Sequence, residues 1–478
     1  MKLEDILYRH FGYEAFREGQ KEVIEAILEG RDAVALLPTG MGKSLCYQLP
    51  GYILNGPILI ISPLLSLMQD QVDSLKRFGE KRVIAFNSFL QGSEKLHALQ
   101  RIATYRYIFI SPEMLATDLI QRVFQKIDFS LIVVDEAHCI SQWGFDFRPD
   151  YLKIASWIPK RNRPPILALS ATATEQVVID IKTYLKMIHP FEYIHSVERP
   201  NIHYDVINLP SVEEKLPWII NHVVQTEGPG IIYTQSRKKT LLYAEELRKK
   251  QIRAAAYHAG MEMEDRQFIQ QQFQSGELEW ICATTAFGMG IHKDNVYQVL
   301  HDHIPATMAN YMQEVGRAGR DGKDALAILV HSPKDEDQTR FIVTDDLPSS
   351  YHVEAFMEYQ RLEQDPKKMI DLNQISETGY RVLSYWMAQL PGEKVIQKLE
   401  DLRRQKVEQI REVANFVEAQ KCMREGLVSY FGQSLEEKPP NCCHFCGINH
   451  QEIVATREFH PVSRNRPSWQ ERLHALMP

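Results

Sequence analysis

Short runs of apolar residues, each ending in a turn rich in Gly, Ser or Asp, recur from Asp32 to about residue 330. The runs are continuous and rich in Ile, Val and Leu, as in strands that are buried on both faces of a parallel sheet. Helical patterns such as 66–78 and 175–185 separate them, and this alternation predicts an α/β architecture. The first series of predicted strands comprises 33–37, 58–61, 107–110, 131–134 and 166–169.

A second series of apolar runs follows a short polar segment, Ser-Val-Glu-Arg-Pro-Asn at 196–201. Proline and asparagine favour turns, so this segment is predicted to link two α/β domains. We expect the domains to cover 1–197 and 198–340. The second series of predicted strands comprises 230–233, 254–257, 280–283, 298–300 and 325–330.

The pattern changes after residue 331, where an acidic connection begins. Residues 393–425 contain neither Gly nor Pro, and their apolar positions fall close to one helical face, which predicts one long helix or two stacked helices. The stretch 341–392 has the character of an insertion, either a helical spacer or a substitute for part of a duplex-binding surface. We expect a helical connector and metal-binding domain at 341–450. A polar tail at 451–478 should end in a short helix capped by Ser468 and Glu471.

Composition narrows the class of protein. The 478 residues are 44% hydrophobic and 24% charged, which is typical of globular domains. Formal net charge is −7, unlike a simple basic nucleic-acid binder, although one basic groove is compatible with it. The sequence contains no run of 18 apolar residues, so no membrane span is predicted. Glu4 and Asp5 argue against a secretory signal. We therefore expect a cytoplasmic protein.

A glycine-rich loop with a lysine follows the first predicted strand. Gly40 and Gly42 allow backbone N–H groups to surround phosphate oxygens, Lys43 would reach the β- and γ-phosphates, and Ser44 would ligate Mg²⁺. A helix starting near Lys43 would direct its positive end at the anion. Leu37 replaces the first glycine of the strict pattern, and the alternative is an ordinary strand-to-helix turn. The predicted nucleotide-binding loop comprises Thr39, Gly40, Met41, Gly42, Lys43 and Ser44.

Two further motifs complete a predicted site for ATP hydrolysis. Asp135 and Glu136 follow the predicted strand 131–134, where Asp135 would hold Mg²⁺ and Glu136 would orient or deprotonate the attacking water. The alternative is a pair of acids that cap the next helix. Arg317 and Arg320, separated by Ala and Gly, would stabilise charge on the γ-phosphate from the second domain. The alternative is two surface arginines at a helix end.

At these residues the chain resembles a superfamily 2 helicase, and more closely the RecQ family of DNA helicases. The resemblance is strong over about residues 1–330 and weaker over 410–446. It is carried by Phe11-Gly-Tyr, Phe16-Arg-Glu-Gly-Gln20, the Asp-Glu-Ala-His box and the stretch 139–148. It implies two RecA-like domains in tandem, followed by a small helical zinc-binding domain. It also implies that Tyr13, Arg17 and Gln20 recognise adenine, as an amide and an aromatic ring can.

The resemblance further implies residues that contact DNA. The aromatic-rich loop contributes Trp143, Phe147 and Arg148, which would stack on and sense single-stranded bases. The alternative is a loop that packs onto the sheet. The family commonly has His where this chain has Phe145, so a His-mediated role there is not expected. Ser170-Ala-Thr172 resembles the motif that couples hydrolysis to movement. Other loops after strands would hold the DNA backbone through Ser62, Arg237, His258 and Thr284.

Four cysteines cluster near the C-terminal end of the sequence. In a cytosolic chain this clustering indicates a metal before a disulfide, and the family has a four-cysteine zinc site here. Only Cys443 and Cys446 form a C-x-x-C pair, and adjacent ligands are sterically demanding. His444 or His450 could replace one cysteine, and a degenerate site without metal is the alternative. The favoured zinc ligands are Cys422, Cys442, Cys443 and Cys446.

These observations predict an ATP-dependent DNA helicase that uses ATP, Mg²⁺ and Zn²⁺. By resemblance, it translocates 3′ to 5′ on single-stranded DNA and unwinds duplexes in DNA repair and recombination. We expect the partners to be single-stranded and forked DNA, together with a single-strand-binding protein or repair proteins. We also expect a monomer that associates with the nucleoid and does not bind a membrane. The 32 residues after Cys446 are too few for the family's winged helix. A translocase with little strand separation is therefore one alternative. An RNA helicase and a non-catalytic protein that uses ATP only as a switch are the other two.

Overall fold

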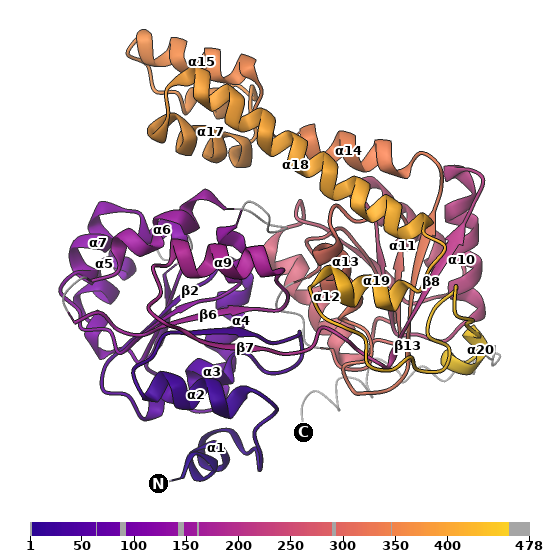
Figure 1. The fold of residues 1–478 in the computed structure, drawn as a ribbon, viewed down its shortest axis with the longest axis horizontal. Helices are drawn as coiled ribbons and strands as arrows, with labels where there is room; N and C mark the ends of the chain where they lie inside the picture. Colours follow the sequence, from indigo (N-terminus) through magenta and orange to yellow (C-terminus); the bar gives the residue numbers. More distant parts are fainter. Residues whose placement is uncertain are drawn as a thin grey trace, which may run out of the picture.

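The computed structural model describes residues 2–63, 65–86, 92–141, 148–159, 162–288, 293–345 and 347–457. Two parallel sheets lie side by side, and a layer of helices crosses above both of them (Figure 1). The predicted capping pair Ser468 and Glu471 lies outside the described residues. Among the helices described, none is both long and apolar enough to span a lipid bilayer.

The first lobe is built on seven parallel strands in the order β3-β4-β2-β5-β6-β1-β7. Its central strands are completely buried, as their apolar runs predict. The strands are β1 Ala33–Leu36, β2 Ile58–Ile61, β3 Val83–Phe86, β4 Tyr107–Ile110, β5 Leu131–Val134, β6 Ile166–Ser170 and β7 Phe191–Ile194.

Helices cover both faces of this sheet, and the apolar residues form one cluster on each face. The α-helices of this lobe are α1 Leu3–Phe11, α2 Gln20–Leu28, α3 Leu45–Gln48, α4 Leu65–Arg77, α5 Gly92–Gln100, α6 Pro112–Leu115, α7 Asp118–Phe124, α8 Ile154–Trp157 and α9 Glu175–Tyr184. Short 3₁₀ turns are η1 Pro50–Tyr52, η2 Ile102–Thr104, η3 Ala137–Ile140 and η4 Pro149–Lys153.

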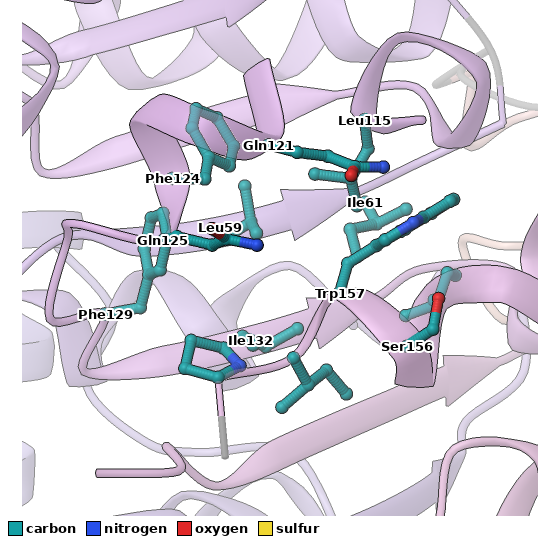
Figure 2. Close-up of a pocket in the computed structure, with 13 residues that line it drawn as sticks. Leu59, Ile61, Leu115, Gln121, Phe124, Gln125, Phe129, Ile132, Ser156 and Trp157 are labelled. Atoms are coloured by element: carbon teal, nitrogen blue, oxygen red, sulfur yellow. The ribbon is translucent and has the colours of Figure 1, made fainter. Parts of the chain in front are cut away.

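A small apolar cavity of ≈ 50 Å³ lies under α7 and α8 on one face of this sheet (Figure 2). Leu59, Phe124 and Trp157 are among the side chains that line it. Its described lining includes none of the residues predicted to bind nucleotide or DNA. The predicted chemistry is therefore located elsewhere.

The second lobe contains six parallel strands in the order β10-β11-β9-β12-β13-β8. Its strands are β8 Ile202–Asn208, β9 Gly230–Tyr233, β10 Ala254–Tyr257, β11 Trp280–Ala283, β12 Gln298–His301 and β13 Ala325–His331. Its helices are η5 Val212–Glu214, α10 Lys215–Gln225, α11 Arg237–Lys249, α12 Met263–Ser275 and α13 Met308–Val315. Residues 196–201, predicted to be a linker, connect β7 of the first sheet with β8 of the second.

A helical arm, residues 335–418, follows the second lobe and extends above the first (Figure 1). Its helices are α14 Asp335–Asp345, α15 Ser350–Arg361, α16 Lys368–Asp371, α17 Glu377–Gln389 and α18 Gly392–Glu418. The chain then turns into α19 Met423–Tyr430, a loop with three cysteines, and α20 His450–Ile453. The predicted helical region at 393–425 is thus two helices, because the chain leaves the helical conformation at Ala419, where ψ is 129°.

Candidate functional site

The phosphate loop connects β1 to α3 at the carboxyl edge of the first sheet. Gly40 and Gly42 have φ angles of 92° and 73°, which glycine adopts without steric cost. A Cβ on Gly42 would lie only 2.8 Å from Gln20 Nε2. The helix that follows begins at Leu45 and has four residues, so the predicted helix dipole is small here. The attraction for phosphate must therefore come from the loop's backbone N–H groups and from Lys43 more than from this helix.

The segment predicted to recognise adenine contacts this loop directly. Gln20 Nε2 donates to the carbonyl oxygens of Met41 and Gly42, at 2.8 and 3.1 Å, and Gln20 Oε1 accepts from Arg17 N at 2.9 Å. Arg17 Nη1 donates to Gly40 O. Tyr13 is 52% exposed. The segment is thus positioned by the phosphate loop, and its contact with adenine stays a prediction.

The acidic pair follows β5, at the same carboxyl edge of the first sheet as the phosphate loop. Glu136 adopts a left-handed conformation with φ of 48°, an uncommon one for a residue with a side chain, which turns the chain sharply after the strand. Glu136 Oε1 lies 3.8 Å from Lys43 Nζ. Desolvation, and then the charge of Glu136, raise the pKa of Asp135 to about 7. The structure thus brings the lysine and the two acids into one site.

Several buried polar atoms of this site have no hydrogen-bond partner among the described residues. They include Lys43 Nζ and Glu136 Oε2, although His138 Nδ1 lies 3.4 Å from the latter. Burying charged groups without hydrogen bonds is costly, so the site fits a ligand with both phosphate and cationic character. ATP with Mg²⁺ has this character. Ser44 and Asp135 would hold the metal, which would supply positive charge beside the phosphates.

The arginines of the second lobe lie against the phosphate loop. Thr39 Oγ1 donates to Gly316 O at 3.1 Å, and a Cβ on Gly40 would lie 3.5 Å from Arg320 Cδ. Arg317 is 4% exposed, and its Nε makes no hydrogen bond among the described residues. Burial, and then repulsion by Arg317, lower the pKa of Arg320 to about 10. Together, the buried guanidinium group of Arg317 and the partly buried one of Arg320 favour an anion between the lobes, such as a γ-phosphate.

The Ser-Ala-Thr motif is joined to the Asp-Glu-Ala-His box through His138, a residue without a predicted role. His138 Nδ1 lies 2.9 Å from Ser170 Oγ, which donates to Thr172 O at 3.0 Å. Both side chains are completely buried. The last residue of the Asp-Glu-Ala-His box thus contacts the Ser-Ala-Thr motif at the end of β6. The signal was present in the sequence, since His138 follows the acids by two positions and a histidine can bridge two hydroxyl or carboxylate groups.

The residues predicted to hold DNA lie where strands end. Ser62 follows β2, His258 follows β10 and Thr284 follows β11, all at the carboxyl edges of the two sheets. Arg148 Nη1 donates to Pro63 O at 2.8 Å and so joins the loop that contains Ser62. Arg237 begins α11 and packs against Gly260, the glycine of the loop after β10. Trp143, Phe145 and Phe147 lie outside the described residues.

The four cysteines of the C-terminal region converge. The four Sγ atoms all lie within 4.8 Å of one another; they belong to Cys422, Cys442, Cys443 and Cys446. The Sγ atoms of Cys422 and Cys442 are 3.7 Å apart, and those of Cys422 and Cys443 are 4.0 Å apart. Tetrahedral zinc with Zn–S distances of about 2.3 Å places its sulfurs about 3.8 Å apart, so the cluster fits Zn²⁺. His450 Nε2 instead lies 2.7 Å from Asp205 Oδ2.

The cysteine loop is joined to the second lobe and to the linker. Its backbone pairs with β8, where His444 N donates to Tyr204 O at 3.0 Å. Arg424, 1% exposed, donates to Glu198 Oε1 and Arg199 O, both at 2.8 Å. It also donates to the carbonyl oxygens of Pro200 and Ile202. The zinc site and the linker between the lobes therefore form one hydrogen-bonded unit.

Two parallel-sheet lobes with a phosphate loop, paired acids and arginines at their junction define a helicase of superfamily 2. Residues 17–181 match the DEAD/DEAH box helicase family, 214–322 the helicase conserved C-terminal domain, and 380–448 the RecQ zinc-binding domain. The chain belongs to the RecQ family of ATP-dependent DNA helicases, as the sequence analysis predicted.

Individual relatives agree with this assignment. The chain is 40% identical to the probable ATP-dependent DNA helicase RecS of Bacillus subtilis, over 99% of this chain and 98% of the relative. It is 37% identical to the ATP-dependent DNA helicase RecQ of Haemophilus influenzae over 92% of this chain, and spans 63% of that relative. The fold resembles that of the DUF1998 helicase MrfA bound to DNA, with a TM-score of 0.60, 18% identity, and coverage of 71% of this chain and 52% of that one.

Proposed function

We propose that this chain couples ATP hydrolysis at the lobe junction to 3′-to-5′ movement along single-stranded DNA, and so unwinds duplex DNA in repair and recombination. The proposal rests on the proposed roles of the site residues and on the family's ATP-dependent DNA helicases. Single-stranded and forked DNA would be the substrates. A single-strand-binding protein or repair proteins would be the partners of a monomer associated with the nucleoid.

One observation supports this function above the others: both lobes meet at the phosphate loop. Thr39 of the loop bonds Gly316, and Arg320 packs on Gly40. A nucleotide bound there would contact both lobes, so its γ-phosphate would favour the closed arrangement, and hydrolysis would release it. Repeated closing and opening would move the loops after the strands along DNA.

Each residue of the site has a distinct role in this proposal. Lys43 would bind the β- and γ-phosphates, and Glu136 would orient the attacking water and accept its proton. Arg317 and Arg320 would stabilise the charge that develops on the transferred phosphoryl group. The contact of His138 with Ser170 would carry changes at the acids to the end of β6.

The experiment that tests the function measures ATP hydrolysis and strand separation side by side. Single-stranded DNA, forked duplex, blunt duplex and single-stranded RNA of matched length are the substrates. We expect single-stranded DNA to stimulate hydrolysis more than RNA, and only forks with a 3′ tail to be unwound. Stimulation without unwinding of any fork would support the alternative of a translocase, and stronger stimulation by RNA would support an RNA helicase.

A further inference from the structure

The helical arm is fixed at its root to the second lobe. Its last turns place Ile410, Val413 and Phe416 in the apolar cluster that also contains Tyr311 and Met312 of α13. The same α13 leads directly into the arginine segment 316–320. The root of the arm therefore shares a packed core with the helix that positions the arginines, and the two must move together.

The tip of the arm, formed by α15, α16, α17 and the first half of α18, has a core of its own. This cluster contains only arm residues among those described. A separate packed core makes the tip a rigid body, carried by the long helix α18. Its buried members are Val353, Phe356, Met369, Ile375, Val382, Leu383, Val395, Leu399 and Leu402.

The tip lies over the first lobe, with α17 above α6 and α9 (Figure 1). Arg381 Nη1 on α17 donates to Glu113 Oε1 of α6 at 3.1 Å. The same carboxylate oxygen lies 3.9 Å from Arg148 Nη1. Lys153 Nζ of the first lobe lies 5.5 Å from the centre of the Tyr385 ring. The arm thus makes a second contact between the lobes, in addition to that at the phosphate loop.

This second contact is polar and open to water. The side chains of Arg381 and Glu113 are 44% and 26% exposed, and no residue of the tip belongs to the described apolar clusters of the first lobe. Such an ion pair contributes little to folding but is easily broken and formed again. It has the properties of a contact that alternates as the lobes move, unlike the apolar contact at the root.

We propose that the Arg381–Glu113 ion pair is a latch that favours the closed arrangement of the two lobes. The inference rests on the proposed function, because closure is what binds ATP between the phosphate loop and the arginines. A latch far from the nucleotide raises the population of closed molecules and so strengthens ATP binding without contacting ATP. Its partner surface is the α6 segment of the first lobe, and its occupant is the tip of this chain's own arm.

The test compares steady-state ATP hydrolysis, with saturating single-stranded DNA, by the wild-type chain, Arg381→Met, Glu113→Gln and the double variant. Arg361→Met is the matched control, because Arg361 lies on the same arm, is 75% exposed and pairs only within its helix with Glu358 at 2.7 Å among the contacts described. We expect Arg381→Met to raise the KM for ATP about 1.5- to 5-fold without lowering kcat. Arg381→Met should add little to Glu113→Gln, because both changes break the Arg381–Glu113 pair. Arg381 also pairs with Glu377 of its own helix, at 2.6 Å, and Arg361→Met controls for the loss of a within-helix pair of this kind.

The outcomes separate the latch from the helicase assignment. Equal KM values for Arg381→Met and Arg361→Met would refute the latch, as would independent addition of the Glu113→Gln and Arg381→Met effects. A fall in kcat at constant KM would also refute it, since the arm would then affect chemistry and not closure. A wild-type chain that shows no DNA-stimulated hydrolysis would overturn the proposed function, and the latch with it.

Discussion

Replacement of Arg424 by Met should destabilise the junction between the cysteine loop, the linker and the second lobe. The side chain is 1% exposed and donates to one carboxylate and three carbonyl oxygens of the segment 198–202. Methionine fills a similar volume and can still pack on the ring of Tyr204, which lies 5.2 Å from the guanidinium carbon. The change therefore removes mainly the charge and the hydrogen bonds.

The expected decrease in the free energy of unfolding depends on the acceptor groups that lose their hydrogen bonds to Arg424. Hydrogen bonds to charged groups contribute about 1.5–3 kcal/mol, and breaking a buried ion pair costs about 3–5 kcal/mol. Glu198 is 23% exposed, so water can partly compensate its carboxylate, which places the expected loss near the lower end, at about 3 kcal/mol. For a unit the size of the second lobe this corresponds to a decrease in Tm of about 6–12 °C.

Thermal unfolding followed by calorimetry, with bound zinc measured in the same samples, checks this expectation. Arg411→Met is the control, because Arg411 is 55% exposed on α18 and its pair with Glu408 lies on the surface. It should change the unfolding free energy by less than about 0.5 kcal/mol. If Arg424→Met unfolds like Arg411→Met while it retains zinc, the hydrogen bonds to the linker do not stabilise the fold and our reasoning is wrong.

Three further predictions concern the metal and nucleotide sites. Lys43→Ala should lower DNA-stimulated hydrolysis at least about 100-fold, and a wild-type rate would show that the assigned site is wrong. Protein purified without chelator should hold about one zinc per chain, less than about a quarter equivalent would exclude the zinc site, and Cys446→Ser should lower the occupancy. Without nucleotide, Asp135 keeps its proton in the folded chain from about pH 4 to about pH 7, where the same group is ionised in the unfolded chain. The free energy of unfolding therefore falls as pH rises through this range. Asp135→Asn should therefore stabilise the chain at about pH 8 and have no such effect near pH 4 when Tm is measured, whereas a pH-independent difference would contradict the raised pKa.

The sequence was sufficient for the central strands and for the loops that follow them. Strands such as β2 and β5 are buried on both faces, so their apolar runs are unbroken and the motif residues begin where burial ends. The missed strands are β3, β7 and β8, and all three lie at sheet edges. In β7 the exposure alternates along the strand, so the continuous apolar pattern is lost. The strand β3 is a short apolar run, Val83–Phe86, and nothing in its burial explains why it was missed.

Buried polar residues were the second reason why strands were missed in the sequence. In β8, His203 and Asp205 interrupt the apolar run, and they are tolerated because Asp324 and His450 lie beside them in the folded chain. These partners are more than 100 positions away, so no local pattern contains them. The convergence of the adjacent Cys442 and Cys443 on one cluster is likewise a result of chain packing.

The sequence by itself determined the fold class and the family, and it placed the predicted residues of each half of the nucleotide site, because those depend on residue types at short spacings after strands. Only the tertiary structure decided which distant groups meet: Thr39 with Gly316, Arg424 with the linker, and Arg381 with Glu113. The physical reason is that burial patterns are local properties of a chain, whereas the pairing of charges across lobes depends on how packed bodies are oriented in space.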